Sequence, residues 1–226
     1  MTGGRVVALV PARNEAGRIV ATVAGLRSLP QVDEVVVVDD GSTDGTTAAA
    51  RAAGATVLRL PRRAGKGRAM EGALRRLRPA DVWVLADGDL GESASRLRPV
   101  LAEVMAARAD LAVAVLPPAM AGGFGLVKRA AAAAIRLLSG FRAREALSGQ
   151  RAITAEALEA CRPLAAGFGV ETAMTIDAVR RGFRVVEVEA DLGHRATGRD
   201  LRGFAHRARQ GLDVVRAVMP RALGLR

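Results

Sequence analysis

Two aspartates separated by a single glycine stand where a short apolar run ends. Asp87 and Asp89 follow the stretch VWVLA, and Gly88 lies between them. Carboxylates two positions apart in a turn can approach one ligand together, and Mg²⁺ or Mn²⁺ accepts such oxygens when a substrate diphosphate supplies the others. The alternative is an ordinary Asp-Gly turn with both acids in water. The apolar run favours the metal-diphosphate interpretation, because it predicts a buried strand that ends at this point.

Two further polar clusters follow apolar runs. Asp39 and Asp40 come directly after four valines, and the turn-forming residues GSTDG come after Asp39 and Asp40. Lys66 has a glycine on each side and stands just before a helical stretch, where backbone amides favour phosphate. The alternative for Lys66 is a basic helix start in water. The segment is not a P-loop, since no Ser or Thr follows the lysine, and no G-x-G-x-x-G motif is found.

The first half of the chain alternates short Val/Leu runs with alanine-rich stretches. The expected strands are 5–10, 34–38, 56–60, 82–86 and 111–115. The expected helices between them are 17–26, 44–53, 67–77 and 93–107. This alternation predicts an α/β fold with a mostly parallel central sheet. Because ligands bind at the carboxyl edge of such sheets, the segments PARNE, DDGSTDG, PRRAGKG and ADGDL are expected to form one site.

The regular alternation of expected strands and helices ends after residue 116. A glycine-containing loop precedes the helical stretch LVKRAAAAAIRLLSG. The later expected elements are a strand at 150–153, helices at 155–161 and 170–181, a strand at 184–188 and an Arg-rich helix from about residue 200. Since the sequence shows no internal repeat or low-complexity linker, we expect a single domain, 1–226, with two functional halves, 1–116 and 117–226.

The charge of the chain bears on the partners that it attracts. The formal net charge is +11, and Lys66 and Lys128 are the only lysines among 34 basic residues. Such a surface attracts phosphates, acidic membranes or nucleic acid. Nucleic acid is disfavoured, because only six residues are aromatic and single-strand binding relies on aromatic stacking platforms.

Cysteine content and hydropathy limit the compartment. Cys161 is the only cysteine, so neither an intramolecular disulfide nor a cysteine-cluster zinc site can form. The first apolar run stops at Pro11 and does not resemble a signal peptide, and no uncharged apolar run has the length of a membrane span. We expect a cytoplasmic protein, and a peripheral position on the cytoplasmic face of the membrane is compatible with this expectation.

Two segments mix apolar residues and arginines at helical spacing. They are GFGLVKRAAAAAIRLLSGFRAR and RDLRGFAHRARQGLDVVRAV. A position on an anionic membrane explains both segments. The alternatives are ordinary amphipathic helices with one buried face, or a contact between two copies of the chain in a homodimer.

The motifs together resemble a known family. VPARNEAGRI, VVVVDDGSTDGT, RRAGKGRAM and VLADGDL resemble, in order and spacing, the nucleotide-sugar-binding half of family 2 glycosyltransferases with the GT-A fold. The later segments GFGVETAMTIDAVRRG and DLGHRATGR are similar to those of the related glucosyl-3-phosphoglycerate synthases. The resemblance covers most of residues 5–200 and is more specific in the first half. It implies a GT-A-like sheet in which 1–116 binds a nucleotide sugar and 117–226 faces the acceptor.

The resemblance also implies roles for individual residues. Asp89 would ligate the metal ion, and His194 would complete the metal site, since imidazole is a common metal ligand. The alternative for His194 is a hydrogen-bonding residue at the surface. The residues implied in nucleotide binding are Pro11, Ala12, Arg13, Glu15, Asp40, Lys66, Asp87 and Gly88.

Glu171 would face the sugar or the reacting centre, with Asp89 as the second residue implied in catalysis. The alternative is that Glu171 only complements the helix dipole, because an acid at the start of a helix is stabilising without any role in catalysis. Thr172 follows it, whereas many inverting members have a Glu-Asp pair whose Asp is the general base. The sequence is therefore at least as compatible with retention of the anomeric configuration of the sugar as with its inversion, and the stereochemistry stays open.

The acceptor side is implied by the segment LSGQRAIT. The similar synthases hold a glycine-rich acceptor loop with an arginine here, which corresponds to Gly149, Gln150 and Arg151. Arg151 can bind a phosphate or carboxylate with two parallel hydrogen bonds. The alternative is an ordinary surface arginine.

These observations predict a glycosyltransferase dependent on Mg²⁺ or Mn²⁺. Its donor would be a UDP- or GDP-sugar, and its acceptor a small phosphorylated molecule or a polyprenyl phosphate. One alternative is a sugar-phosphate nucleotidyltransferase, although VPARNEAG lacks the Gly-rich Arg/Lys loop typical of that class. Another is a nucleotide-binding scaffold at the membrane without catalytic activity.

Overall fold

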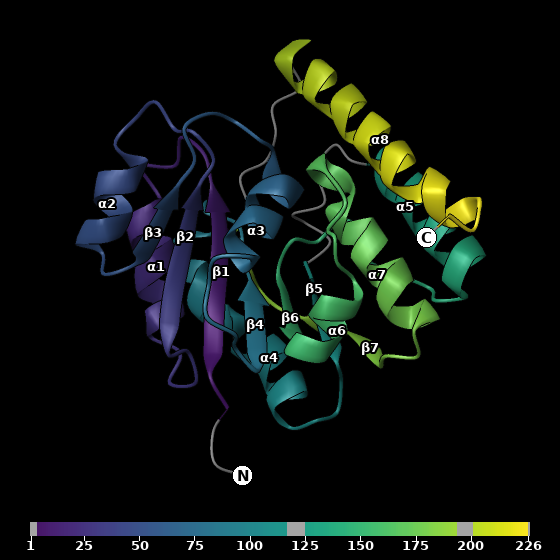
Figure 1. Cartoon of the computed structure of the whole chain (residues 1–226), viewed down its shortest axis with the longest axis horizontal. Helices are drawn as coiled ribbons and strands as arrows, with labels where there is room; N and C mark the ends of the chain where they lie inside the picture. Colours follow the sequence, from purple (N-terminus) through teal and green to yellow (C-terminus); the bar gives the residue numbers. More distant parts are fainter. Residues whose placement is uncertain (1–3, 117–124, 194–200, 226) are drawn as a thin grey trace.

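Strands and helices alternate along the chain in the computed structural model, which describes residues 4–116, 125–193 and 201–225, and the backbone alone for 201–210 (Figure 1). The strands are β1 (Val6–Ala12), β2 (Glu34–Asp39), β3 (Thr56–Arg59), β4 (Val82–Leu85), β5 (Leu111–Val115), β6 (Arg151–Thr154) and β7 (Val185–Glu189). The α-helices are α1 (Ile19–Arg27), α2 (Thr46–Ala52), α3 (Lys66–Leu74), α4 (Arg98–Met105), α5 (Gly125–Ser139), α6 (Ala155–Ala160), α7 (Val170–Arg180) and α8 (Leu201–Ala222). Two 3₁₀ helices, η1 (Gly91–Leu97) and η3 (Gly167–Gly169), are also described.

The described strands form one sheet in the order β3-β2-β1-β4-β6-β5-β7. Strands β3, β2, β1 and β4 run parallel, and β7 is parallel to β5. Strand β6 lies between β4 and β5 and is antiparallel to both. The expected α/β class with a mostly parallel sheet is therefore confirmed. The reversed direction of β6 places its first residue at the edge where β4 ends.

The valine run of β2 shows why the sheet is covered on both sides. Val35 and Val37 belong to one buried cluster, and Val36 and Val38 belong to another. Successive side chains of a strand point to opposite faces, so a continuous apolar run requires both faces to be covered. Figure 1 shows α3, α6 and α7 in front of the sheet and α1 and α4 behind it.

A smaller third cluster lies where α5, α7 and α8 pack together. Its buried members include Ala131 and Ile135 of α5, Ile176 of α7 and Val214 of α8. Helix α7 is buried from Val170 to Ala178, because the sheet covers one of its sides and the other two helices cover the rest. The first turn of α7 is therefore held firmly from several directions.

Most element boundaries fall within three residues of those expected, and one expected helix is wrong. The stretch expected as a helix at 93–107 is divided into η1 and α4. Pro99 lies in the first turn of α4, where it needs no hydrogen-bond partner. In one continuous helix the proline ring would instead clash with the carbonyl one turn earlier. The expected division into halves at residue 116 stays a prediction, and no helix among the described residues is long and apolar enough to cross a bilayer.

Candidate active site

The predicted functional segments meet at one edge of the sheet. Strands β1 and β2 pair in parallel up to Ala12 and Asp39, which are partners in register. Strand β4 also runs parallel to β1 and is followed by Asp87. Arg151, the first residue of the antiparallel strand β6, is the register partner of Leu85. Residues separated widely in sequence therefore come together at this edge.

Lys66 stands at the centre of the site. Its Nζ lies 2.5 Å from Oδ1 of Asp87 and 2.6 Å from Oε1 of Glu171. The other oxygen of Asp87 accepts a hydrogen bond of 3.0 Å from Nε2 of Gln150. The Lys66 side chain is 17% exposed, so the alternative of a basic helix start in water is wrong. The Asp87 carboxylate also has two protein partners, in contrast to a freely solvated acid.

The charge state of Lys66 follows from these contacts. Burial lowers the pKa of Lys66, but the negative charges of Asp87 and Glu171, and the hydrogen bonds that Lys66 donates to them, outweigh burial. The pKa of Lys66 is therefore raised above its ordinary value, and the side chain is an ammonium ion at neutral pH. One positive charge faces two carboxylates, which leaves this group of three side chains with a net negative charge.

The loop before α3 is held by Asp40. Its two carboxylate oxygens accept hydrogen bonds from the backbone N–H groups of Ala64, at 2.5 Å, and Gly65, at 2.9 Å. Gly65 has a φ of 90°, a conformation that favours glycine, and it precedes the first residue of α3. Asp40 thus fixes the position from which Lys66 reaches the site, a contact that the sequence did not predict.

Two glycines allow the loops to approach closely. A Cβ atom at Gly149 would lie 2.7 Å from Oδ2 of Asp87 and nearer still to Nζ of Lys66. A Cβ atom at Gly88 would lie 2.9 Å from Cβ of Ala12. Both distances are too short for an undisturbed Cβ contact, so a larger residue at either position would force its neighbours to shift.

Arg151 lies under the site and is not the surface residue that the alternative expected. It is only 1% exposed, and its Nε and Nη1 donate to the Ser148 carbonyl at 2.8 Å and to Thr175 Oγ1 at 3.0 Å. Burial lowers the pKa of Arg151, and the charge of Glu171 acts in the opposite direction. Nη2 of Arg151 has no hydrogen-bond partner among the described residues. A buried donor of this kind is available to a ligand.

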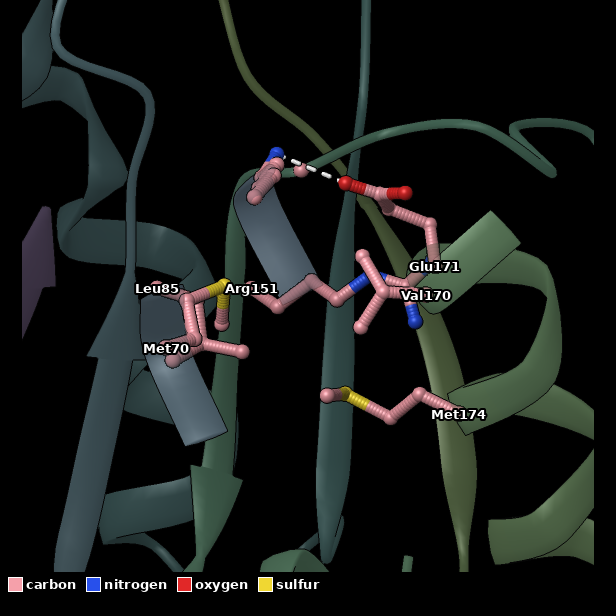
Figure 2. A pocket seen from close by; sticks show the side chains of 8 residues that line it. Met70, Leu85, Arg151, Val170, Glu171 and Met174 are labelled. Atoms are coloured by element: carbon pink, nitrogen blue, oxygen red, sulfur yellow. Dashed lines mark ion pairs between the residues drawn. The ribbon is translucent and has the colours of Figure 1, made fainter. Parts of the chain in front are cut away.

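A small pocket lies between these residues. Figure 2 shows Arg151 beneath the carboxylate of Glu171 in that view. Met70 and Met174 lie near the Arg151 side chain, and a dashed line marks the ion pair between Lys66 and Glu171. The lining residues are Lys66, Met70, Leu85, Gly149, Arg151, Val170, Glu171 and Met174. Charged groups thus lie at the mouth of the pocket and methionine side chains lie below them.

The turn that carries Asp89 is held by α1. Thr22 Oγ1 donates to the Gly88 carbonyl at 2.9 Å and accepts from the Gly91 N–H at 2.8 Å. Nη1 of Arg18 donates to the backbone carbonyl of Asp89 at 3.1 Å. Thr22 is fully buried and was missed in the sequence, where a lone threonine inside a helix gives no signal of this contact.

The donor set at this turn fits a hard divalent cation. Asp89 is partly exposed at the sheet edge, and a carboxylate there offers the oxygen ligand that Mg²⁺ and Mn²⁺ prefer. No group of three or more His, Cys, Asp or Glu residues suited to a metal occurs in the part of the chain that the structure describes. One or two protein ligands are sufficient when phosphates complete the coordination. His194, the second expected ligand, lies outside the described residues.

The segment implied in nucleoside binding follows β1 at the same edge. Asn14 has a φ of 56°, and its Oδ1 accepts a hydrogen bond of 2.9 Å from the Thr43 N–H. The N–H of Glu15 donates to Oγ1 of Thr46 at 2.9 Å. The loop after β1 is thus tied to the loop after β2. Arg13 is exposed beside it, and the roles of Pro11, Ala12, Arg13 and Glu15 toward a nucleoside stay predictions.

Comparison with known proteins agrees with this geometry. The model of glycosyl transferase family 2 matches residues 7–154. Glycosyltransferase AglJ of Haloferax volcanii is 30% identical over 203 residues, covering 88% of this chain and 66% of AglJ. The glucosyl-3-phosphoglycerate synthase of Mycobacterium tuberculosis is 32% identical over 219 residues, covering 85% of this chain and 67% of the synthase. This chain therefore spans about two thirds of the length of both relatives.

A solved structure of the synthase extends the similarity to three dimensions. The Mycobacterium tuberculosis enzyme in complex with Mn²⁺, UDP and glucosyl-3-phosphoglycerate superposes with a TM-score of 0.80 and 29% identity. The match covers 96% of this chain and 81% of the synthase chain. The same synthase has also been solved with Mg²⁺ and UDP. Since the family model covers more than half of the sequence and the sheet has the GT-A-like architecture of these neighbours, the chain belongs to glycosyl transferase family 2, a family of glycosyltransferases.

Proposed function

We propose that this protein transfers a sugar from a UDP-sugar to a phosphorylated acceptor, with Mg²⁺ or Mn²⁺ as cofactor. The observation that carries the proposal is the grouping of Lys66, Asp87 and Glu171 beside the pocket of Arg151, at the carboxyl edge of the sheet. The similar synthase has been solved with UDP and with either cation, which supports this choice of donor and cofactor.

The donor side uses the residues before and after the strands. Asp89 and His194 would hold the cation, which supplies positive charge to the diphosphate as it leaves. Lys66 contributes a second, permanent positive charge at the same edge. The residues proposed to contact the nucleotide are Pro11, Ala12, Arg13, Glu15, Asp40, Lys66, Asp87 and Gly88.

The acceptor side is proposed at Arg151, with Gly149 and Gln150. The unpartnered Nη2 of Arg151 is a buried donor that a phosphate or a carboxylate would satisfy, and the unpartnered Oε1 of Gln150 is a buried acceptor that a hydroxyl group would satisfy. The similar synthase has been solved with phosphoglyceric acid and with glycerol 3-phosphate. Both a small phosphorylated molecule and a polyprenyl phosphate carry such a group, and the acceptor is one of these two classes.

Glu171 is proposed to act at the reacting centre. The ion pair with Lys66 holds the Glu171 carboxylate at the mouth of the pocket, and the first turn of α7 favours its negative charge. Glu171 is therefore positioned between the donor residues and Arg151. Inversion and retention are both compatible with a single carboxylate at this point.

The experiment measures melting temperature and product together. The chain is incubated with UDP- and GDP-sugars, with and without Mn²⁺ or Mg²⁺, and release of nucleoside diphosphate is followed with glycerol 3-phosphate or polyprenyl phosphate as acceptor. We expect a metal-dependent increase of melting temperature with UDP and release of UDP when an acceptor is present. Release of pyrophosphate would establish a nucleotidyltransferase, and a shift with a nucleotide without any turnover would favour the scaffold alternative.

Variants assign the roles. Asp89→Ala should abolish turnover and the metal-dependent shift, because it removes a proposed ligand of the cation. Lys66→Met should lower kcat/KM about 100-fold or more, since Asp87 and Glu171 then lack the ammonium group that pairs with them. Lys128→Met is the second lysine variant for comparison, because Lys128 pairs with Glu145 at 2.7 Å and not with Asp87 or Glu171. Equal activity of the two lysine variants would contradict the role given to Lys66.

A further inference from the structure

The exposed aliphatic side chains gather on one part of the molecule. Seven of the eight large hydrophobic residues described as exposed lie on α5, on α8 or directly after α8. They are Leu126, Leu137, Leu212, Val215, Met219, Leu223 and Leu225. The eighth, Val20, is on α1. We name these seven residues the α5–α8 face.

Helix α8 has two apolar stripes, and the fold uses only one. Val214 and Ala217 point inward, each 5% exposed, together with the buried Arg221. Leu212, Val215 and Met219 are spaced by three and four residues and are 56%, 55% and 52% exposed. This spacing aligns them on one side of a helix, opposite the buried stripe. The second stripe therefore contributes nothing to the core.

The charges on these two helices have one sign where they face water. The exposed charged residues described on α5 and α8 are Arg129, Arg136 and Arg216. The one acid in the described side chains of these helices is Asp213, which is 14% exposed, accepts a hydrogen bond from the Phe168 N–H and lies 3.9 Å from Arg216. Aliphatic side chains with surrounding arginines are the composition that binds an anionic lipid surface.

A second copy of the chain matches this face less well. In a symmetric dimer the same surface meets itself, so the arginines of α5 and α8 would be brought toward arginines of the partner. Like charges at an interface oppose association. An anionic bilayer instead supplies phosphates for the arginines and an apolar layer for the leucines. The charge pattern therefore favours lipid over self-association.

Helix α8 contacts the segment that precedes Glu171 through its inward side, so the exposed stripe is not needed for this contact. Oδ2 of Asp213 accepts the Phe168 N–H at 3.2 Å, and Cβ atoms at Gly167 and Gly169 would overlap with α8. Phe168 is three residues before Glu171 in the chain. Figure 1 shows α8 along the outside of the molecule, with α5 behind it.

We propose that the α5–α8 face docks on the surface of an anionic phospholipid bilayer. The aliphatic residues insert among the lipids, and Arg129, Arg136 and Arg216 bind the phosphate groups. This proposal does not require the proposed sugar transfer, because it rests on the exposed side chains alone. It is tested by binding, without any measurement of activity.

The first test is sedimentation of the full chain with vesicles of phosphatidylcholine, with or without phosphatidylglycerol. We expect binding only to vesicles that contain phosphatidylglycerol, and weaker binding as salt is added. The variant Val215→Glu/Met219→Glu should lower the bound-to-free ratio about tenfold or more, since it places acids in the exposed stripe. Val20→Glu is the matched control and should bind like the unchanged protein.

The second test changes the charges alone. Arg129→Gln/Arg136→Gln should weaken vesicle binding and reduce its dependence on salt, because two lipid contacts are lost. The control Arg51→Gln/Arg98→Gln removes two exposed arginines from α2 and α4 and should leave binding unchanged. Equal loss in both variants would mean attraction by net charge, and would overturn the assignment to this face.

Two further results would overturn the proposal. One is the absence of binding to phosphatidylglycerol vesicles at low salt. The other is a dimer of the unchanged protein in light scattering, together with a failure of this protein to bind vesicles. In that case Val215→Glu/Met219→Glu would convert the dimer to a monomer. The second result would assign the face to self-association.

Discussion

The ammonium group of Lys66 links carboxylates that belong to two different elements. Asp87 follows β4 and Glu171 lies in the first turn of α7, and Lys66 approaches both from the first turn of α3. An ion pair with few water contacts depends strongly on the geometry of its partners. The residues that leave space for the lysine therefore matter as much as the charges themselves. Gly149 is the clearest of these.

We predict that Gly149→Ala lowers activity by displacing Lys66 from Asp87. The added methyl group would lie 2.7 Å from Oδ2 of Asp87, so the side chains must move apart. The expected loss in kcat/KM is about tenfold or more, measured by steady-state kinetics. The control is Gly72→Ala in α3, where nothing lies within 4 Å of the new Cβ. This control should keep its activity and gain about 0.5–1 kcal/mol in unfolding free energy.

At the scale of elements, α7 and α8 are joined by a buried ion pair. Arg221 is 2% exposed and donates to both carboxylate oxygens of Asp177, which is 1% exposed. Removing one partner of such a pair leaves a buried charge without compensation, whereas replacing both by apolar residues is often neutral. The pair therefore fixes how the two helices sit together more than it adds stability.

We predict that Arg221→Met lowers the free energy of unfolding by about 3 kcal/mol, measured in urea. Arg181, 3.5 Å from Asp177, compensates only part of the negative charge that loses its partner. The double variant Asp177→Leu/Arg221→Met should recover most of the loss. A double variant as unstable as the sum of the two single variants would show that the two side chains do not act as a pair.

Helix α3 is joined to the chain before α7 by Glu71. Its carboxylate accepts hydrogen bonds from Arg162 Nη2 at 3.0 Å and from the Leu164 N–H at 3.1 Å. Burial raises the pKa of Glu71, but the hydrogen bonds from Arg162, Leu164 and Arg75 outweigh it and lower the pKa to about 2. This contact holds the segment that leads into η3 and Glu171.

The depressed pKa of Glu71 predicts a pH dependence of stability. Its stabilising effect is complete above pH 4.5, the ordinary pKa, and is lost as the pH falls toward 2. Glu71→Gln should therefore melt several degrees below the unchanged protein at neutral pH, and this difference should become smaller below about pH 4. The control is Glu156→Gln at the exposed start of α6. A difference in melting temperature that is independent of pH would contradict the ionic role.

At the scale of the whole molecule, two apolar layers enclose the sheet, and Cys161 reports on one of them. Its side chain is 1% exposed among residues of the layer that contains α3 and α7, and Sγ donates to the Met174 carbonyl at 3.5 Å. Burial raises the pKa of the Cys161 thiol to about 12, and the charge of Asp177 adds to this effect. The thiolate is the reactive form of cysteine, so the folded protein should protect it.

We predict that Cys161 reacts with a disulfide reagent at about pH 8 only when the molecule unfolds. The reaction, followed by absorbance, should be about 1000-fold slower than for the chain in concentrated guanidinium chloride. Arg221→Met should increase the rate by the same factor as it increases the unfolding equilibrium constant. Cys161 reports this factor directly, because it is the single thiol of the chain. Complete reaction of the native protein within seconds would contradict the buried position.

Local patterns in the sequence determined most elements and one half of the site. The valine run of β2 and the glycine-flanked Lys66 could be assigned from neighbouring residues alone, because strand burial and turn formation depend on short segments. The shared edge of β1, β2 and β4 followed from the rule that parallel strands end together. Family 2 membership followed from the motifs at that edge.

Tertiary structure alone decided how the second half completes the site. Strand β6 enters between β4 and β5, and this position brings Gln150 to Asp87 across 63 residues of sequence. It also buries Arg151, which by sequence could equally have been a surface residue. No local pattern encodes such contacts, because they depend on which strands pair and on how α7 and α8 pack. The exposed stripe of α8 has the same cause: the sequence showed an amphipathic helix, and only the fold decided which of its apolar sides stayed uncovered.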